Sequence, residues 1–222
     1  MKLFKEKYRG LTVWFVYLFN MIVLAGVVAM PMVKFGMGRE QASAYAMAFT
    51  SLLTLLVALK FYQDTIKEAW QKITFPDIIL ACSVGLGIRI VLTMILFSVM
   101  TVQEPENQEI LQSMFENSSA GIMFFTVCIF APIVEELLFR QILIGDLVGK
   151  VSVQLMTIVS SLFFIMMHSG LDFKAGLLYA TVTIPLVGVY RYYQNNVVIS
   201  MSMHFVMNSL AFIGMVAQTA IN

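Results

Sequence analysis

Seven stretches of about twenty mostly apolar residues follow one another along this chain and constrain its fold more than any other feature. They cover residues 11–30, 41–60, 77–102, 120–148, 151–168, 173–191 and 196–219. An apolar stretch of about 20 residues is long enough for an α-helix to cross a bilayer. Backbone polar groups in hydrocarbon need partners within the protein, so such segments are helical. The sequence predicts an all-α, polytopic membrane protein of about seven transmembrane helices, with its functional site in a cavity of the helix bundle.

The composition excludes the main soluble alternatives. Hydrophobic residues make up 59% of the chain and charged residues 12%, and the mean hydropathy is +0.85. A water-soluble domain does not have this composition. The net charge of +1 offers no basic surface for nucleic acid, so the partners we expect are membrane lipid and a peptide or membrane protein. Cys82 and Cys128 lie inside apolar stretches and are predicted to be buried thiols.

The positive charges predict the orientation of the chain, because cytoplasmic loops are enriched in Lys and Arg. Alternating seven spans from a cytoplasmic N-terminus places nine basic residues inside: Lys2, Lys5, Lys7, Arg9, Lys60, Lys67, Lys72, Lys150 and Arg191. Three fall outside: Lys34, Arg39 and Lys174. We therefore expect an integral membrane protein with a cytoplasmic N-terminus.

Two glutamates and an arginine lie inside the fourth apolar stretch, as Glu135, Glu136 and Arg140. A charged side chain at the bilayer centre costs roughly 2.5–3.5 kcal/mol on insertion scales, so such residues are usually functional. Residues four apart share a helix face, so Glu136 can pair with Arg140, whereas Glu135 projects elsewhere. We expect Glu135 to act as a general base and the other two residues to support the site.

The two histidines of the chain lie in the fifth and seventh stretches. His168 follows Phe164 by four residues, and His204 precedes Asn208 by four, so each pair shares a helix face. A lone histidine on an apolar helix is more often a structural, hydrogen-bonded residue. Here two histidines follow a paired-glutamate helix, and Glu135, His168, His204 and Asn208 would supply a base, a water-orienting group and donors to an oxyanion. Peptide hydrolysis requires these groups.

These residues form three ordered motifs, EExxxR, FxxxH and HxxxN, and in them the chain resembles the CPBP or Abi family of intramembrane proteases. That family includes the endopeptidases that trim CAAX proteins after prenylation. The resemblance covers about residues 120–219. It implies that Glu135 and His168 activate water and that His204 and Asn208 stabilise the tetrahedral oxyanion. The Glu136–Arg140 pair would hold the helix that presents Glu135, and Phe164 would support the site.

The resemblance also divides the chain. We expect residues 1–119 to form N-terminal transmembrane helices and an amphipathic surface helix at 61–75. Residues 120–222 would form the CPBP-like catalytic core. The compact chain looks like a prokaryotic member, which implies the bacterial plasma membrane and roles such as peptide maturation or bacteriocin self-immunity. The substrate would be a membrane-associated peptide or protein tail, whether prenylated or not.

The sequence leaves the cofactor open. Glu135, His168 and His204 would suit Zn²⁺ with one position open for water, and the family has been labelled metalloprotease on that ground. The same residues also work without metal, with Glu135 as the base. Metal-free chemistry is slightly favoured, because neither histidine has a carboxylate nearby in sequence to orient it.

Two other classes of function remain open at this stage. The chain could be a non-catalytic scaffold or immunity protein that regulates a membrane partner, or a transporter whose buried Glu and His residues relay protons. The complete set of motifs favours the enzyme over the scaffold. The lack of related halves in the sequence disfavours the transporter. One difficulty is depth, since counting about 1.5 Å per residue puts His204 closer to the cytoplasmic ends of the spans than His168.

Overall fold

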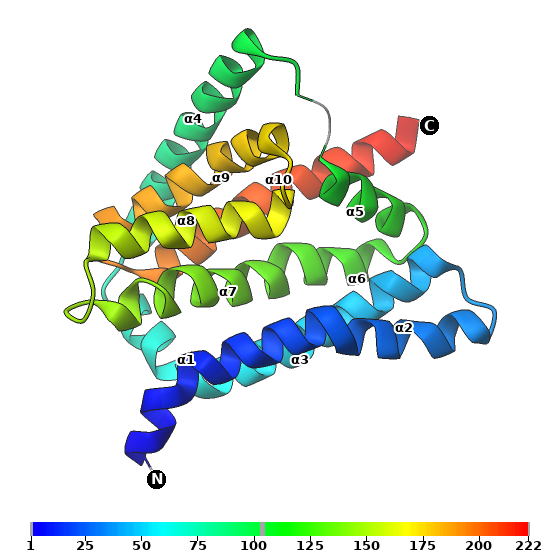
Figure 1. Cartoon of the computed structure of the whole chain (residues 1–222). Coiled ribbons are helices and arrows are strands. Elements are labelled where there is room, and N and C mark those ends of the chain that lie inside the picture. Colours follow the sequence, from blue (N-terminus) through cyan, green and yellow to red (C-terminus); the bar gives the residue numbers. More distant parts are fainter. Residues whose placement is uncertain (1, 103–104, 222) are drawn as a thin grey trace. The chain divides into compact units, whose positions relative to one another are not determined.

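The computed structural model describes residues 2–102 and 105–221, and every regular element in these ranges is a helix, as predicted (Figure 1). Segments labelled η are π-helical, except the 3-10 turn η4. The elements are α1 (Lys2–Phe19), η1 (Asn20–Leu24), α2 (Ala25–Lys34), α3 (Arg39–Trp70), α4 (Phe75–Val99), α5 (Glu106–Glu116), α6 (Ala120–Phe124), η2 (Phe125–Phe130), α7 (Ala131–Glu135), η3 (Glu136–Ile142), η4 (Gly145–Leu147), α8 (Val153–Ser169), α9 (Phe173–Tyr192) and α10 (Val197–Ile221).

Among the described residues, six helical stretches are long and apolar enough to cross a membrane. They are Tyr8–Lys34, Arg39–Trp70, Phe75–Val99, Ala120–Leu147, Phe173–Tyr192 and Val197–Thr219. The remaining predicted span corresponds to α8, which is apolar but only 17 residues long. The protein is therefore a polytopic helical membrane protein, with six full-length spans and one shorter apolar helix.

The segment 61–75 differs from the sequence expectation. Residues 61–70 continue α3 without a break, so they do not form a separate surface helix. The physical reason is that no glycine or proline interrupts the chain between Lys60 and Trp70. The helix ends in a short turn, and α4 begins with a capping box between Thr74 and Asp77. At 32 residues, α3 is about 48 Å long and exceeds the roughly 30 Å of a hydrocarbon core.

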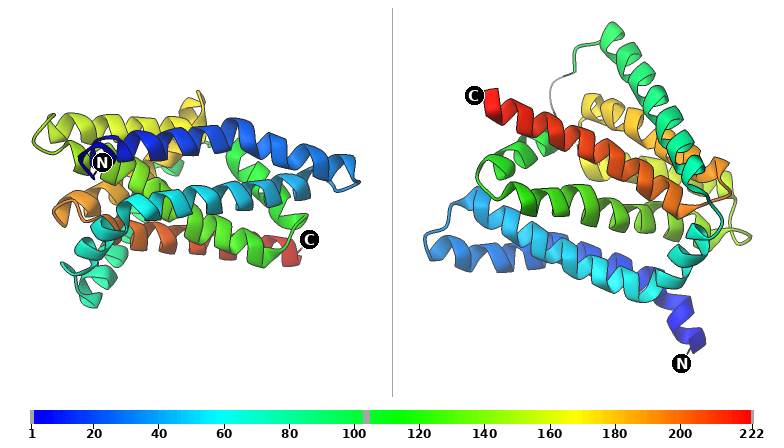
Figure 2. Two further views of the ribbon diagram at one scale, coloured as in Figure 1. Left: turned by 90° about the horizontal axis from the view of Figure 1, so that it is seen from below. Right: turned by 180° about the vertical axis from the view of Figure 1, so that it is seen from behind.

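The chain folds as two compact units, and the first contains Met1–Asp64, Leu111–Leu138 and Asn208–Asn222. In this unit α1, η1 and α2 form one continuous helix. The chain reverses direction after α2, and α3 runs back alongside that helix, as Figures 1 and 2 show. The buried Asn20 side chain ties the two together, because its amide donates to Thr54 Oγ1 at 2.8 Å. A core of Ala44, Phe115, Met123 and Met215 joins α3, α5, α6 and α10.

The second unit contains Thr65–Ile110 and Phe139–Met207. Within it α9 packs against both α4 and α8 (Figure 1). Its core is Ala81, Leu186, Val189, Ile199, Met203 and Met207. Gly85 allows close packing here, because a Cβ atom at this position would lie 2.2 Å from the Met203 methyl carbon.

Both units are built from segments that are distant in sequence, and the division of the chain at residues 119 and 120 stays a prediction. The helix that carries Glu135 and Glu136 is divided between the units. Its residues up to Leu138 belong to the first unit, and those from Phe139 onward belong to the second. The residues of the three motifs are therefore shared between the units, and each group is described in its own unit below.

Candidate functional site

The helix that carries the paired glutamates is not a regular α-helix. The α-helical turn α7 lies between two π-helical segments, η2 and η3, and Glu135 is its last residue. Pro132, which lacks a backbone N–H donor, is buried near the start of this turn. π-helical segments inside α-helices are rare and occur frequently at functional sites. The irregular winding therefore marks the segment where the sequence predicts the general base.

In the first unit, the glutamates differ in exposure: Glu136 is fully buried and Glu135 is half-buried. The phenol of Tyr17, on α1, lies close enough to Glu135 for the carboxylate charge to act on it. No sequence pattern selects Tyr17, because a tyrosine in an apolar helix is usually a packing residue. Its position makes α1 part of the surroundings of the expected base.

Asn208, also in the first unit, is anchored to the glutamate-bearing helix. Its side-chain amide donates to the Val127 carbonyl, in η2, at 2.9 Å. An Asn amide has two N–H donors, so this bond orients the group and uses one of them. The other N–H group is the one that could meet a substrate oxygen.

In the second unit, the Phe164 ring is the centre of a cluster. It stacks on His168 with 4.3 Å between ring centroids and meets His204 edge-on at 5.9 Å. The guanidinium carbon of Arg140 lies 4.8 Å from the Phe164 ring centroid, a cation–π geometry. The structure thus brings together one residue of the first motif, both of the second and the histidine of the third. The depth difference expected between the two histidines is absent here, since both contact one ring.

The tautomer of His168 follows from its backbone contact. Its Nδ1 lies 2.8 Å from the Phe164 carbonyl oxygen. A carbonyl oxygen only accepts hydrogen bonds, so Nδ1 carries the proton and Nε2 is the basic nitrogen of the neutral ring. This arrangement suits His168 to accept a hydrogen bond from water.

Tyr179 and Asn107 extend this cluster but lie outside the three motifs. Tyr179, on α9, is 8% exposed, and its ring centroid lies 5.1 Å from that of His168. The Asn107 side chain, on α5, donates to the Tyr179 hydroxyl at 3.1 Å. A tyrosine among the apolar residues 175–180 is the sequence signal that could have pointed to Tyr179. The contact with Asn107 joins residues 72 positions apart and leaves no local pattern.

Arg140 and Glu136 are both fully buried, and their role in supporting the site stays a prediction. They belong to different units, and their pairing stays a prediction. The same is true of the pairing of Glu135 with His168. Within the second unit, the contact of Arg140 with Phe164 already links the EExxxR and FxxxH motifs.

The fit of a metal can be tested on the donor side chains. Among the residues that the structure describes, no group of three or more His, Cys, Asp or Glu side chains is placed to hold a metal ion. Glu135 belongs to the first unit and His168 and His204 to the second, so a Zn²⁺ site formed by all three stays a prediction, and no step below is routed through a metal.

The chain is thus a polytopic membrane protein with a paired-glutamate helix and with both of its histidines on apolar helices. Residues 117–210 match the family model described as Rce1-like, type II CAAX prenyl endopeptidase. Over this segment the chain is similar to the CAAX proteases, in agreement with the resemblance that the three motifs carry. The match indicates a CAAX-type intramembrane protease in general. Neither a curated protein nor a solved structure matches the chain.

Proposed function

We propose that this protein is an intramembrane endopeptidase that hydrolyses a peptide bond in a membrane-associated peptide or protein tail. The observation that carries the proposal is the Phe164 cluster, which joins residues of all three motifs inside the segment that matches the protease family. Intramembrane ionisable residues are costly and usually functional, and this chain places its only two histidines at one phenylalanine ring.

In the proposed mechanism, Glu135 and His168 act on one water molecule. Nε2 of His168 accepts a hydrogen bond from the water, and Glu135 takes its proton as the water oxygen attacks the peptide carbonyl carbon. The carbonyl π bond opens, and its electron pair becomes an oxyanion. General base catalysis of this kind contributes typically 10²–10⁴-fold to the rate.

His204 and the remaining N–H of Asn208 would donate to that oxyanion. Removing one such donor costs about 10²–10³-fold in kcat in enzymes of known mechanism. The tetrahedral intermediate then collapses, the C–N bond breaks, and the proton held by Glu135 passes to the leaving amine. The immediate products are a carboxylic acid and an amine, which become a carboxylate and an ammonium when one proton passes from the acid to the amine, so atoms and charges balance without another reactant.

The substrate and setting are further parts of the proposal. Of the roles that the resemblance implies, we favour a bacterial one, such as peptide maturation or bacteriocin self-immunity. It would act in the plasma membrane with the N-terminus cytoplasmic, as the nine-to-three distribution of basic residues supports. A substrate lying in the membrane needs no soluble recognition domain.

The proposal is tested by comparing cells that express equal amounts of the wild type, Glu135→Gln and His168→Ala. Mass spectrometry of membrane proteins and released peptides should find a specific fragment only with the wild type. Asp64→Asn, on the polar end of α3, is the control for the loss of a carboxylate and should leave the fragment unchanged. Identical fragments in all four strains would overturn the assignment, and a phenotype rescued equally by Glu135→Gln would favour the scaffold instead.

A further inference from the structure

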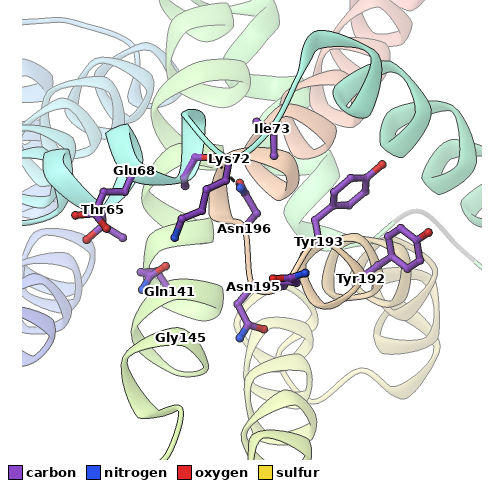
Figure 3. Close-up of a pocket in the computed structure, with 12 residues that line it drawn as sticks. Thr65, Glu68, Lys72, Ile73, Gln141, Gly145, Tyr192, Tyr193, Asn195 and Asn196 are labelled. Carbon is purple, nitrogen blue, oxygen red and sulfur yellow. Dashed lines mark hydrogen bonds between the residues drawn. The ribbon is translucent and has the colours of Figure 1, made fainter.

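A polar pocket of about 510 Å³ lies in the second unit, at one end of its helices. Its walls come from the last turns of α3, the segment around Gln141 and Gly145, and the connection between α9 and α10 (Figure 3). Known small-molecule sites fall in the range of about 300–1,000 Å³. None of the motif residues lines this pocket, so it is separate from the candidate active site.

The pocket lies where helix ends carry the residues of a membrane interface. Trp70 and Tyr192 are 59% and 81% exposed, and tyrosine and tryptophan concentrate at the headgroup level of bilayers. Lys72 and Arg191 add positive charge at the same helix ends. This composition places the pocket at the depth of lipid headgroups.

The connection that forms one wall is held in a defined conformation. Asn195 has φ of 65°, a left-handed conformation that asparagine tolerates, and its side-chain oxygen accepts a hydrogen bond from Arg191. The next residue, Asn196, is 5% exposed, donates to the Ala69 carbonyl at 2.8 Å and accepts from the Val198 N–H at 3.0 Å. The wall is therefore built before any ligand arrives.

Polar groups converge where the opposite wall lacks a side chain. A Cβ atom at Gly145 would lie 2.7 Å from Gln141 Nε2 and 2.7 Å from the Tyr190 hydroxyl oxygen. Glycine at this position lets the Gln141 and Tyr190 side chains pack closely against the backbone. The Gln141 amide also donates to Asp146 Oδ1 at 3.0 Å, so its place in the pocket wall is fixed.

The charges that line the pocket are of both signs. Glu68 lies in the last turn of α3 and Lys72 in the turn that follows this helix, and both are exposed. No ion pair is formed between these two described side chains, and Figure 3 shows Lys72 extending toward Gln141 while Glu68 lies nearer Thr65. One cation beside an amide and one anion in the same pocket wall complement a zwitterion better than a simple anion.

We propose that this pocket binds a phosphoethanolamine-type headgroup of a membrane phospholipid, with the phosphate at Lys72 and Gln141 and the ammonium at Glu68. The position at the membrane interface favours a lipid over a soluble phosphate ester as its source. This site would tie the end of α3 to the α9–α10 connection, and it does not depend on the proposed protease activity.

Native mass spectrometry and thermal unfolding of the full-length protein in detergent test this site. The probes are phosphatidylethanolamine, phosphatidylglycerol and soluble phosphoethanolamine. Phosphatidylethanolamine should bind and raise the unfolding temperature, and Lys72→Gln should weaken its binding about tenfold, because a charge-assisted hydrogen bond is lost. Glu68→Gln should remove the preference over phosphatidylglycerol. Lys67→Gln, an exposed lysine on the same helix outside the pocket, is the control and should change nothing.

Equal weakening by Lys67→Gln and Lys72→Gln would overturn the site in favour of general surface electrostatics. Binding of soluble phosphoethanolamine without the lipid would overturn the lipid as its source. Glu135→Gln should retain lipid binding, which would show that the headgroup site is independent of catalysis. The lipid-binding assay and the fragment-release assay therefore test the two proposals separately.

Discussion

Phe164 holds three charged or titratable side chains of different elements through one ring. Arg140 faces it, His168 stacks on it, and His204 meets its edge. The ring is 1% exposed, so water does not screen these contacts. In the FxxxH motif, the phenylalanine thus does as much to place the histidines as the backbone does.

Phe164→Leu should therefore destabilise the protein and misplace both histidines. Loss of a buried aromatic ring, partly refilled by leucine, costs about 1–3 kcal/mol, and the cation–π contact is lost as well. Thermal unfolding and fragment release measure the two effects. Phe163→Leu is the matched control, since the half-buried Phe163 ring shares with Phe164 the contact with Phe139. Equal loss of activity in both variants would contradict a special role of Phe164.

Tyr179→Phe keeps the ring against His168 and removes only the hydroxyl that Asn107 contacts. We expect kcat to fall about 3–10-fold with little change in KM, because a net hydrogen bond is worth about 1 kcal/mol. Asn107→Ala should have a similar effect, and the double variant should be no worse than either single one if the two residues act together. Strictly additive losses would show that they act separately.

The π-helical segments are the clearest feature at the level of elements. Ser160, on α8, donates to the Phe139 carbonyl in η3, and Asn208 donates to the Val127 carbonyl in η2. Side chains of neighbouring helices thus bond to carbonyls of the irregular segments. In hydrocarbon such partners are needed wherever backbone groups depart from the α-helical pattern.

Pro132→Ala should restore the missing N–H donor and favour regular α-helical winding before Glu135. We expect the unfolding temperature to stay the same or rise, while fragment release falls at least tenfold because the carboxylates are rotated. Pro185→Ala, in the middle of α9, serves as the comparison for removing a helix proline away from the glutamates. Full activity of Pro132→Ala would show that the irregular winding does not position the base.

The start of α10 gives a stability prediction at the same scale. Asn196 caps this helix by accepting from the Val198 and Ile199 N–H groups, and it also donates to Ala69. Asn196→Ala should lower the free energy of unfolding by about 1–3 kcal/mol. Asn196→Asp keeps the cap but loses the donor, so it should be affected less. No change in unfolding with Asn196→Ala would mean that the α3–α10 contact contributes little.

For the whole molecule, the apolar stretches predicted the helices and the three motifs predicted the family, because both signals are local in sequence. The sequence missed what depends on distant contacts or on fine winding. Examples are the continuation of α3 through residue 70, the π-helical turns around Glu135, and the contact of Asn107 with Tyr179. By contrast, the four-residue spacing of the FxxxH motif correctly predicts that His168 contacts Phe164. Both residues lie within the regular helix α8.

The central claim is that Glu135 takes a proton from the water that cleaves the peptide bond. The most direct measurement follows a peptide spanning the cellular cleavage site, incubated with the purified protein in lipid vesicles and ¹⁸O-labelled water. The account predicts one ¹⁸O atom in the new C-terminal carboxylate with the wild type and no product above background with Glu135→Gln. Labelled product formed at the wild-type rate by Glu135→Gln would contradict it.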